Sequence, residues 1–287
     1  MKRISIKTPA KINLGLKIKG LRPDGYHEIE TTMQMVGLFD ELTFEKIEEG
    51  IDLITDTEIT SSMEENIVYK AFSLLSGKAR GYGVRIRLKK NIPMSAGLGG
   101  GSSDGAATLV GLNRLWGTGL NRKELMDFGR RLGSDVPFFL FGPSALARGR
   151  GDLLAPVKPL NEWILLINPL LPVSTAWVYK TYEKFKELGS ETKLLTKRRD
   201  NIKLSGFQQR ITKYINDLEK VTLLKFPEIE KIKDDLIGSG AMVAQMSGSG
   251  PTVFGIFSKK KYAEEASKRF KDYKVIVVKT LTKSPLI

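Results

Sequence analysis

The residues from Asn91 to Ser103 have the composition of a phosphate-binding loop, Asn-Ile-Pro-Met-Ser-Ala-Gly-Leu-Gly-Gly-Gly-Ser-Ser. Because glycine has no Cβ, its backbone can turn sharply and approach a ligand closely. Residues 104–116 follow with apolar side chains at helical spacing, and we expect Ser102 and Ser103 to cap that helix. Unpaired N–H groups at a helix start, together with the positive end of the helix dipole, bind anions. The segment therefore predicts a phosphate site. A flexible, serine-capped surface loop is the alternative, but glycines that meet serines at a helix start do not form a linker.

The standard nucleotide-binding motifs are absent from this sequence. A Walker loop needs G-x-x-x-x-G-K-[ST], and the nearest segment is Gly77-Lys78. Phe72 stands where the first glycine belongs, and Ala79 stands where serine or threonine belongs. Neither the G-x-G-x-x-G fingerprint nor the protein-kinase motif set occurs. The predicted phosphate site must therefore belong to another architecture.

Length and composition restrict the chemistry that the chain can do. Its 287 residues suffice for two domains, and 41% hydrophobic with 27% charged residues is ordinary for a globular protein. There is no cysteine, which excludes disulfides, iron–sulfur clusters and thiol catalysis. His27 is the single histidine, so a site with several histidine ligands is excluded as well.

The net charge of +14 fits either a nucleic-acid-binding protein or an enzyme for small polyanions. The 46 basic residues are scattered along the chain, and this pattern favours small polyanions. Basic residues interrupt the N-terminus before an apolar region develops, so no secretory signal is predicted. The longest uncharged stretch, 236–258, contains five glycines and a proline and does not read as a membrane span. We expect a cytoplasmic protein without a membrane partner.

Alternation of apolar and polar residues over 3–19 predicts a strand whose polar face carries Lys11, Asn13 and Gly15. A turn with Pro23 and Gly25 follows this strand. Further along, the pattern predicts strands at 29–38, 40–46, 51–55 and 83–89, and helices at 65–76 and 121–132.

The pattern of predicted strands and helices changes near residue 156. Alternating strands and helices there predict a two-layer α+β domain, so we expect domains at 1–155 and 156–287. The polar segment 186–205 is predicted to be an exposed insertion. The expected strands are 163–168, 241–246, 253–257 and 274–279, and the expected helices are 207–224, 227–236 and 259–271.

Three segments follow one another in a distinctive order: Pro9-Ala-Lys-Ile-Asn-Leu-Gly-Leu16, Pro93 to Ser103, and Met246-Ser-Gly-Ser-Gly-Pro-Thr252. In that order and at those separations they resemble the motifs of the GHMP kinases. The segments 22–29 and 133–138, with Asn216-Asp-Leu-Glu219, are similar to those of the branch whose substrate is a cytidine diphosphate ester of methylerythritol. The resemblance implies an α+β GHMP kinase fold, with an N-terminal domain like ribosomal S5 domain 2 and a ferredoxin-like C-terminal domain.

The resemblance also implies roles for single residues. Lys11 and Asp135 match the catalytic lysine and the catalytic aspartate that takes the proton of the substrate hydroxyl. The alternatives are a solvated lysine on a strand and an aspartate that only caps a turn. The ATP phosphates would be bound by the loop residues Pro93, Met94, Ser95, Ala96, Gly97, Leu98, Gly99, Gly100, Gly101, Ser102 and Ser103.

For the second substrate, Tyr26 and His27 would hold the cytosine, and Asn13 would contact the erythritol or the diphosphate. Tyr179 is the candidate for a second aromatic wall, with a core aromatic residue as the alternative. Lys90 would contact the nucleotide phosphates; the alternative is a surface lysine. The segment 247–250 would form a second backbone platform or a plain hairpin turn.

Mg²⁺ is the expected metal, although its ligands cannot be assigned from the sequence. Ser102 or Ser103 would supply a hydroxyl, and Asp104 is a candidate that would otherwise only favour the helix N-terminus.

The expected activity is ATP-dependent phosphorylation of the 2-hydroxyl of the cytidine diphosphate substrate, in the non-mevalonate route to isoprenoids. The alternatives are a kinase of the mevalonate or homoserine type and a basic, S5-like nucleic-acid-binding protein. We expect a monomer or a weak homodimer with no nucleic-acid partner.

Overall fold

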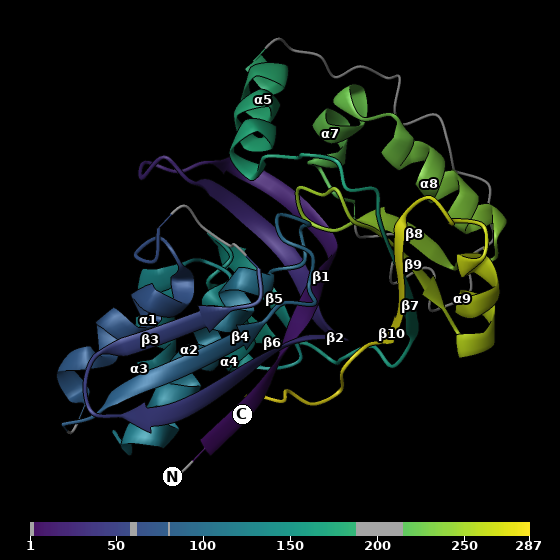
Figure 1. The fold of residues 1–287 in the computed structure, drawn as a ribbon. Helices are drawn as coiled ribbons and strands as arrows, with labels where there is room; N and C mark the ends of the chain where they lie inside the picture. Colours follow the sequence, from purple (N-terminus) through teal and green to yellow (C-terminus); the bar gives the residue numbers. More distant parts are fainter. Residues whose placement is uncertain (1–2, 58–61, 80, 188–214) are drawn as a thin grey trace.

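Two long antiparallel strands, β1 (Arg3–Leu21) and β2 (His27–Ile47), run through the middle of the molecule. The computed structural model describes residues 3–57, 62–79, 81–187 and 215–287 (Figure 1). The two strands predicted at 29–38 and 40–46 form one strand, β2. The break in alternation between them is a shift of register, because Pro9 pairs with Phe39 whereas Ala10 pairs with Val36. A bulge therefore lies at the boundary between the two predicted strands.

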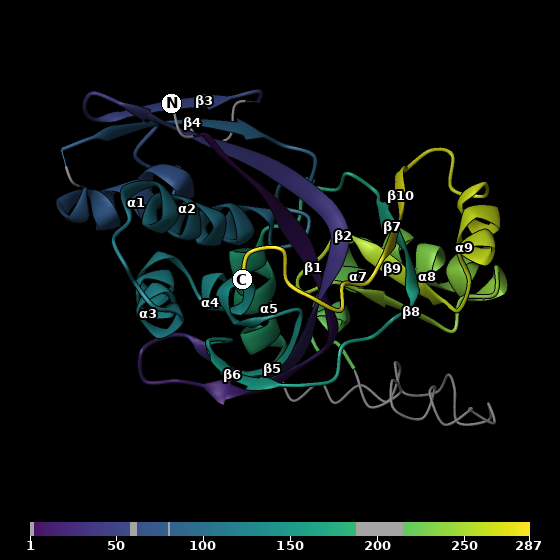
Figure 2. The same cartoon turned by 90° about the horizontal axis from the view of Figure 1, so that it is seen from below.

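β2 is the centre of the N-terminal sheet. It pairs with β1 on one side and, on the other side, with β4 in its second half and β5 in its first half. The helices α1 to α4 lie against one face of this sheet (Figures 1 and 2). The remaining elements of this unit are β3 (Ile51–Thr55), α1 (Ile67–Leu75), the short 3-10 helix Ser76–Lys78, β4 (Gly83–Lys89), α2 (Gly100–Trp116), α3 (Arg122–Leu132), α4 (Val136–Phe141), β5 (Ser144–Gly149) and β6 (Leu153–Pro156).

The glycine-rich segment begins its helix earlier than the sequence predicted. α2 starts at Gly100 and Gly99 is its N-cap residue, so Ser102 and Ser103 lie inside the first turn and cap nothing. The prediction was wrong because Gly99 adopts a left-handed conformation (φ 68°), which ends the loop before the serines are reached. For α3, in contrast, Asn121 and Glu124 form the reciprocal hydrogen bonds of a capping box.

The C-terminal unit contains a four-stranded antiparallel sheet in the order β10-β7-β9-β8. In chain order, helices follow the first and the third of these strands. Together with the sheet order, this is the expected ferredoxin-like arrangement. The predicted segment 186–205 lies outside the described residues except at its first two positions, and so does the first part of the helix predicted at 207–224. The elements are β7 (Trp163–Asn168), α5 (Thr175–Glu187), α7 (Glu219–Lys225), α8 (Glu228–Gly238), β8 (Val243–Met246), β9 (Val253–Phe257), α9 (Lys260–Ser267) and β10 (Lys274–Lys279).

Alternate residues of β7 face two different layers of core. Leu165 and Ile167 pack among the side chains of the C-terminal helices. Ile164 and Leu166 pack against Ile12 and other residues of the N-terminal unit. Because side chains alternate across a strand, one sheet separates these two cores, and the second core joins the two units. Apolar side chains from both units are therefore removed from water where the units meet.

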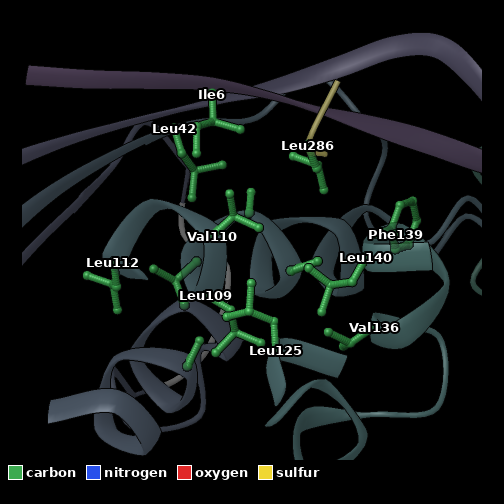
Figure 3. Packing of buried hydrophobic residues seen from close by; sticks show 14 of the residues in the cluster. Ile6, Leu42, Leu109, Val110, Leu112, Leu125, Val136, Phe139, Leu140 and Leu286 are labelled. Carbon is green, nitrogen blue, oxygen red and sulfur yellow. The ribbon is translucent and has the colours of Figure 1, made fainter. Parts of the chain in front are cut away.

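The end of the chain returns to the N-terminal unit, as the yellow segment in Figures 1 and 2 shows. The backbone N–H of Leu281 donates to the carbonyl of Met35. Leu286 is fully buried in the N-terminal core above Val110 of α2 (Figure 3). Within the described part of the chain, no helix combines the length and the apolarity needed to cross a bilayer.

Candidate active site

The glycine-rich loop is held by its apolar side chains and exposes its polar backbone. Ile92, Ala96 and Leu98 are buried in the core between the two units. The backbone is left-handed at Ser95 (φ 50°), Gly97 (φ 73°) and Gly99 (φ 68°). Left-handed residues within a loop help to turn its N–H groups toward a concavity, and such concavities bind anions. The loop therefore leads an anion-binding backbone into the start of α2.

Gly97 leaves no room for a side chain, and Gly99 leaves little. A Cβ on Gly97 would lie 2.2 Å from the carbonyl oxygen of Ser247, and one on Gly99 would lie 3.0 Å from two side-chain carbons of Lys11. The hydroxyl of Ser247 also donates to the Gly97 carbonyl (2.8 Å). The loop thus packs tightly between strand β1 and the loop that follows β8.

Lys11 and Asp135 lie beside each other next to this loop. The Lys11 ammonium is 3.4 Å from a carboxylate oxygen of Asp135, and the Lys11 N–H donates to the carbonyl of Leu98 (2.9 Å). The Lys11 side chain is only 6% exposed, whereas that of Asp135 is 34% exposed. Asp135 stands at the N-cap position of α4, but its side chain makes no capping hydrogen bond. The carboxylate is therefore the accessible member of the pair.

Asn13 holds the lysine in place. Its Oδ1 accepts from the Lys11 ammonium (2.6 Å), and its Nδ2 donates to the hydroxyl of Thr31 (2.8 Å). The Asn13 side chain is buried, and a bulge in β1 follows it directly. Both ends of its amide are thus used inside the protein, so Asn13 orients Lys11.

A second loop, residues 247–250, completes the floor of the site. The Asn216 amide donates to the carbonyls of Met246 (3.0 Å) and Gly248 (2.7 Å). A Cβ on Gly248 would lie 3.1 Å from the Asn13 amide oxygen. The segment from Asn216 to Glu219 therefore fixes this loop against β1, a role that the sequence motif alone did not reveal.

The residues predicted to bind the base form two separate contacts. The ring of His27 packs on the ring of Tyr179 with centroids 4.8 Å apart, and its Nε2 lies 2.7 Å from Glu183 of α5. Tyr26 is 55% exposed and faces the guanidinium of Arg150. Burial raises the pKa of the Tyr179 hydroxyl, and the negative charge of the Asp135 carboxylate raises it further.

Sequence reasoning missed a buried group of charges under the loop. The Lys90 ammonium pairs with Asp40 and with Asp104 (2.8 Å), and its side chain is 7% exposed. The Asp40 carboxylate accepts the N–H groups of Asn91 (2.6 Å) and Ile92 (2.8 Å). Lys90 is therefore a buried lysine beneath the loop and not a surface residue. Desolvation raises the pKa of the Asp104 carboxyl to about 7, although the Lys90 charge opposes this shift.

The described residues offer few groups of their own to a metal ion. Among the described residues, no group of three Asp, Glu or His side chains has the arrangement of a metal site. Ser103 is fully buried and its hydroxyl accepts from Thr8 (2.7 Å), while Asp104 is paired with Lys90. Of the candidates, Ser102 is the partly exposed one. This donor set fits a Mg²⁺ ion held mainly by the phosphates of a ligand.

The site combines a phosphate cradle with a lysine–carboxylate pair at its side. Transfer of a phosphoryl group needs an aligned acceptor, neutralised charge and a group that receives the acceptor proton. Backbone N–H groups and the Lys11 ammonium can neutralise phosphate charge, and the accessible Asp135 carboxylate can receive a proton.

Comparisons with known proteins agree with this chemistry. The family model described as GHMP kinases N terminal domain matches residues 66–143, and that described as GHMP kinases C terminal matches residues 197–275. The chain is similar to the 4-diphosphocytidyl-2-C-methyl-D-erythritol kinase of Geobacter metallireducens, with 40% identity over 98% of this chain and 100% of that protein. For the protein of the same name from Thermodesulfovibrio yellowstonii, the identity is 42% over 97% and 98%.

Solved structures show the same likeness. A crystal structure of 4-(cytidine 5'-diphospho)-2C-methyl-D-erythritol kinase has a TM-score of 0.78 and 31% identity, with coverage of 96% of this chain and 99% of that chain. The homoserine kinase from Cytophaga hutchinsonii has a TM-score of 0.71 at 20% identity, over 99% and 96% of the two chains. This second likeness shows the shared fold.

Proposed function

The chain belongs to the family of 4-diphosphocytidyl-2-C-methyl-D-erythritol kinases, and on that premise we propose how its residues perform the reaction. The enzyme uses ATP to phosphorylate the 2-hydroxyl of 4-diphosphocytidyl-2-C-methyl-D-erythritol, a step of the non-mevalonate route to isoprenoids. The observation that carries the proposal is the position of Lys11. Its backbone contacts the glycine-rich loop at Leu98, and its ammonium contacts the Asp135 carboxylate.

In the proposed reaction, residues 93–103 bind the ATP phosphates through backbone N–H groups. Backbone donors suit this task because they are fixed by folding and are not reorganised during the transfer. The buried side chains of Ile92, Ala96 and Leu98 support this role, since they anchor the loop in the core between the two units.

Asp135 receives the proton of the substrate hydroxyl. An ionised carboxylate can act at this point because phosphoryl transfer has a loose transition state, in which the hydroxyl keeps its proton until late. Lys11 lies next to it and stabilises negative charge on the acceptor and the transferred group. The hydrogen bond from Lys11 to Asn13 keeps the ammonium at this position.

Mg²⁺ is the proposed metal, bound by the ATP phosphates together with the Ser102 hydroxyl. When bound, it would neutralise charge on the phosphoryl oxygens. The buried, hydrogen-bonded Ser103 supports Ser102 as the loop's contribution.

We propose that Tyr26, His27 and Tyr179 bind the cytosine. Stacking of a base on an aromatic ring contributes about 1–3 kcal/mol in nucleic-acid complexes. Because the rings of His27 and Tyr179 contact each other directly, the exposed ring of Tyr26 is the available stacking surface in this conformation. Asn13 orients Lys11 through its Oδ1, and the second N–H of its Nδ2 would contact the erythritol or the diphosphate.

A comparison of substrates tests the proposed function. The purified enzyme should transfer phosphate from ATP to the cytidine diphosphate substrate and should show no comparable turnover of mevalonate or homoserine. Neither of those compounds carries a base for Tyr26. Turnover of mevalonate or homoserine alone would refute the proposal.

The cellular setting remains part of the proposal. We propose a cytoplasmic monomer or weak homodimer that acts on small molecules, with its charge of +14 attracting anionic substrates. Sedimentation velocity tests the oligomeric state. An RNA-binding titration at several salt concentrations tests the alternative, since a nucleic-acid-binding protein would lose affinity steeply with salt.

A further inference from the structure

We propose that Arg150 binds the diphosphate of the cytidine substrate, an inference that rests on the proposed function. Arg150 lies in the turn between β5 and β6. Its guanidinium carbon is 4.8 Å from the centroid of the Tyr26 ring. A guanidinium stacked on an aromatic face keeps its N–H groups free at the edge, where they can donate to an anion.

The same turn also reaches the catalytic carboxylate. The residue after Arg150 is Gly151, and a Cβ built on it would lie 3.9 Å from Oδ1 of Asp135. Two consecutive residues therefore lie beside the two ends of the substrate site. One contacts the aromatic ring proposed to stack on the base, and the other borders the carboxylate proposed to receive the hydroxyl proton.

The covalent structure of the substrate determines what must lie between these two ends. Its diphosphate links the cytidine to the methylerythritol that carries the reacting hydroxyl. With the base on Tyr26 and the hydroxyl at Asp135, the diphosphate passes beside the turn that contains Arg150. The planar guanidinium matches two phosphate oxygens at once, which makes arginine well suited to this position.

Neighbouring cations are held more firmly by protein groups than Arg150 is. Lys11 is buried between Asn13 and Asp135. Arg22 pairs with Asp24 (3.2 Å) and Glu28 (2.7 Å). Among the described residues, Arg150 forms an ion pair with Asp152 alone, at 3.8 Å, and its side chain is 32% exposed. Among these residues, Arg150 loses the weakest ion pair with the protein when its guanidinium binds a phosphate.

Arg148 provides a matched control on the same strand end. It is an arginine two residues earlier, paired with Glu30 (3.0 Å) and 60% exposed. Substitution of Arg148 removes the same charge from the same part of the fold without touching Tyr26. The comparison of Arg150→Ala with Arg148→Ala therefore separates a local effect from the loss of one positive charge.

The test uses binding of cytidine and of cytidine diphosphate, measured by calorimetry on the full chain. In Arg150→Ala, the affinity for cytidine diphosphate should fall about tenfold or more, while that for cytidine stays within about twofold. Arg150→Lys should lie between wild type and Arg150→Ala, because it keeps the charge and loses the paired donors. Arg148→Ala should resemble wild type.

The kinetics provide a second measurement. The KM for the cytidine diphosphate substrate should rise in Arg150→Ala, with the KM for ATP unchanged. Equal losses of cytidine and cytidine diphosphate binding would overturn the inference, since Arg150 would then act only through Tyr26. Unchanged binding of both ligands would overturn it too. If the wild-type enzyme does not phosphorylate this substrate at all, the proposed function itself fails.

Discussion

The Lys11 ammonium donates to the Asn13 amide oxygen at 2.6 Å, closer than its 3.4 Å approach to the Asp135 carboxylate. The amide therefore fixes the ammonium, and the carboxylate remains the more loosely held partner, with a third of its side chain exposed. A proton acceptor must be able to reach the substrate hydroxyl, so this division suits a catalytic carboxylate with a lysine held behind it.

Replacement of Asp135 by alanine should abolish turnover while ATP binding persists, because the carboxylate acts on the acceptor and not on the nucleotide. We expect kcat to fall by a factor of about 100 or more and the affinity for ATP to change by about threefold at most. Lys11→Ala should also reduce kcat strongly. Steady-state kinetics with calorimetric ATP titrations measure both quantities, with Asp127→Ala on the surface of α3 as the control. Full activity of Asp135→Ala would show that the carboxylate is only structural.

Gly97→Ala should destabilise the protein, because the new Cβ would meet the Ser247 carbonyl at 2.2 Å and the φ of 73° is strained for alanine. We expect the free energy of unfolding to fall by about 1–3 kcal/mol. Gly101→Ala is the matched control, since no atom lies within 4 Å of its Cβ position. Urea unfolding of both variants checks this. Equal stability of the two would mean that the loop does not pack on Ser247 as described.

The buried Asp104 should make stability depend on pH. Burial raises the pKa of its carboxyl from 3.8 to about 7, so between these values the folded protein holds a proton that the unfolded chain has lost. The free energy of unfolding attributable to this group therefore falls as the pH rises through that window. Asp104→Asn should flatten the slope by at most about 1.4 kcal/mol per pH unit.

Urea unfolding at several pH values measures that slope, and Asp127→Asn, which removes an exposed carboxylate, is the control. The groups facing Asp104 are Lys90, Asp40 and the Thr8 hydroxyl, so the titration belongs to the whole cluster. An Asp104→Asn slope equal to that of wild type would contradict the assignment.

Tyr26→Ala should raise the KM for the cytidine substrate about tenfold or more and leave the KM for ATP nearly unchanged, because a stacked base is lost. Tyr82→Ala is a matched control, since Tyr82 is 50% exposed and also has a cation, Lys46, over its ring. Initial-rate kinetics with each substrate varied in turn give both constants. A larger effect on the KM for ATP would show that the cytosine does not bind at Tyr26.

The local parts of this structure could be predicted from the sequence. Alternation along β1 placed Lys11 and Asn13 on one face, and the structure joins their side chains by a hydrogen bond. The helix predicted at 121–132 is α3, capped by Asn121 and Gly133, and its bounds were predictable because caps depend on neighbouring residues only. The family resemblance predicted the two-part fold, which the sheet orders and the comparisons confirm.

Contacts between distant segments could not be predicted. Asp40 meets Asn91 and Lys90 across about fifty residues of sequence, and nothing in its own neighbourhood signals that it anchors the loop. Arg150 looked like one basic residue among many, because its contact with Tyr26 exists only after β5 has paired with β2. The N-cap of α2 is Gly99 and not one of the predicted serines, for a similar reason. Packing of the loop on Lys11 and Ser247 decides where the left-handed residues fall.

A crystal structure of the enzyme with a non-hydrolysable ATP analogue and the cytidine diphosphate substrate tests the central claim most directly. The triphosphate should lie along residues 93–103, with its terminal phosphorus facing the substrate hydroxyl and that hydroxyl within hydrogen-bond reach of Asp135. A nucleotide bound elsewhere, with its terminal phosphate remote from Lys11 and Asp135, would contradict the account.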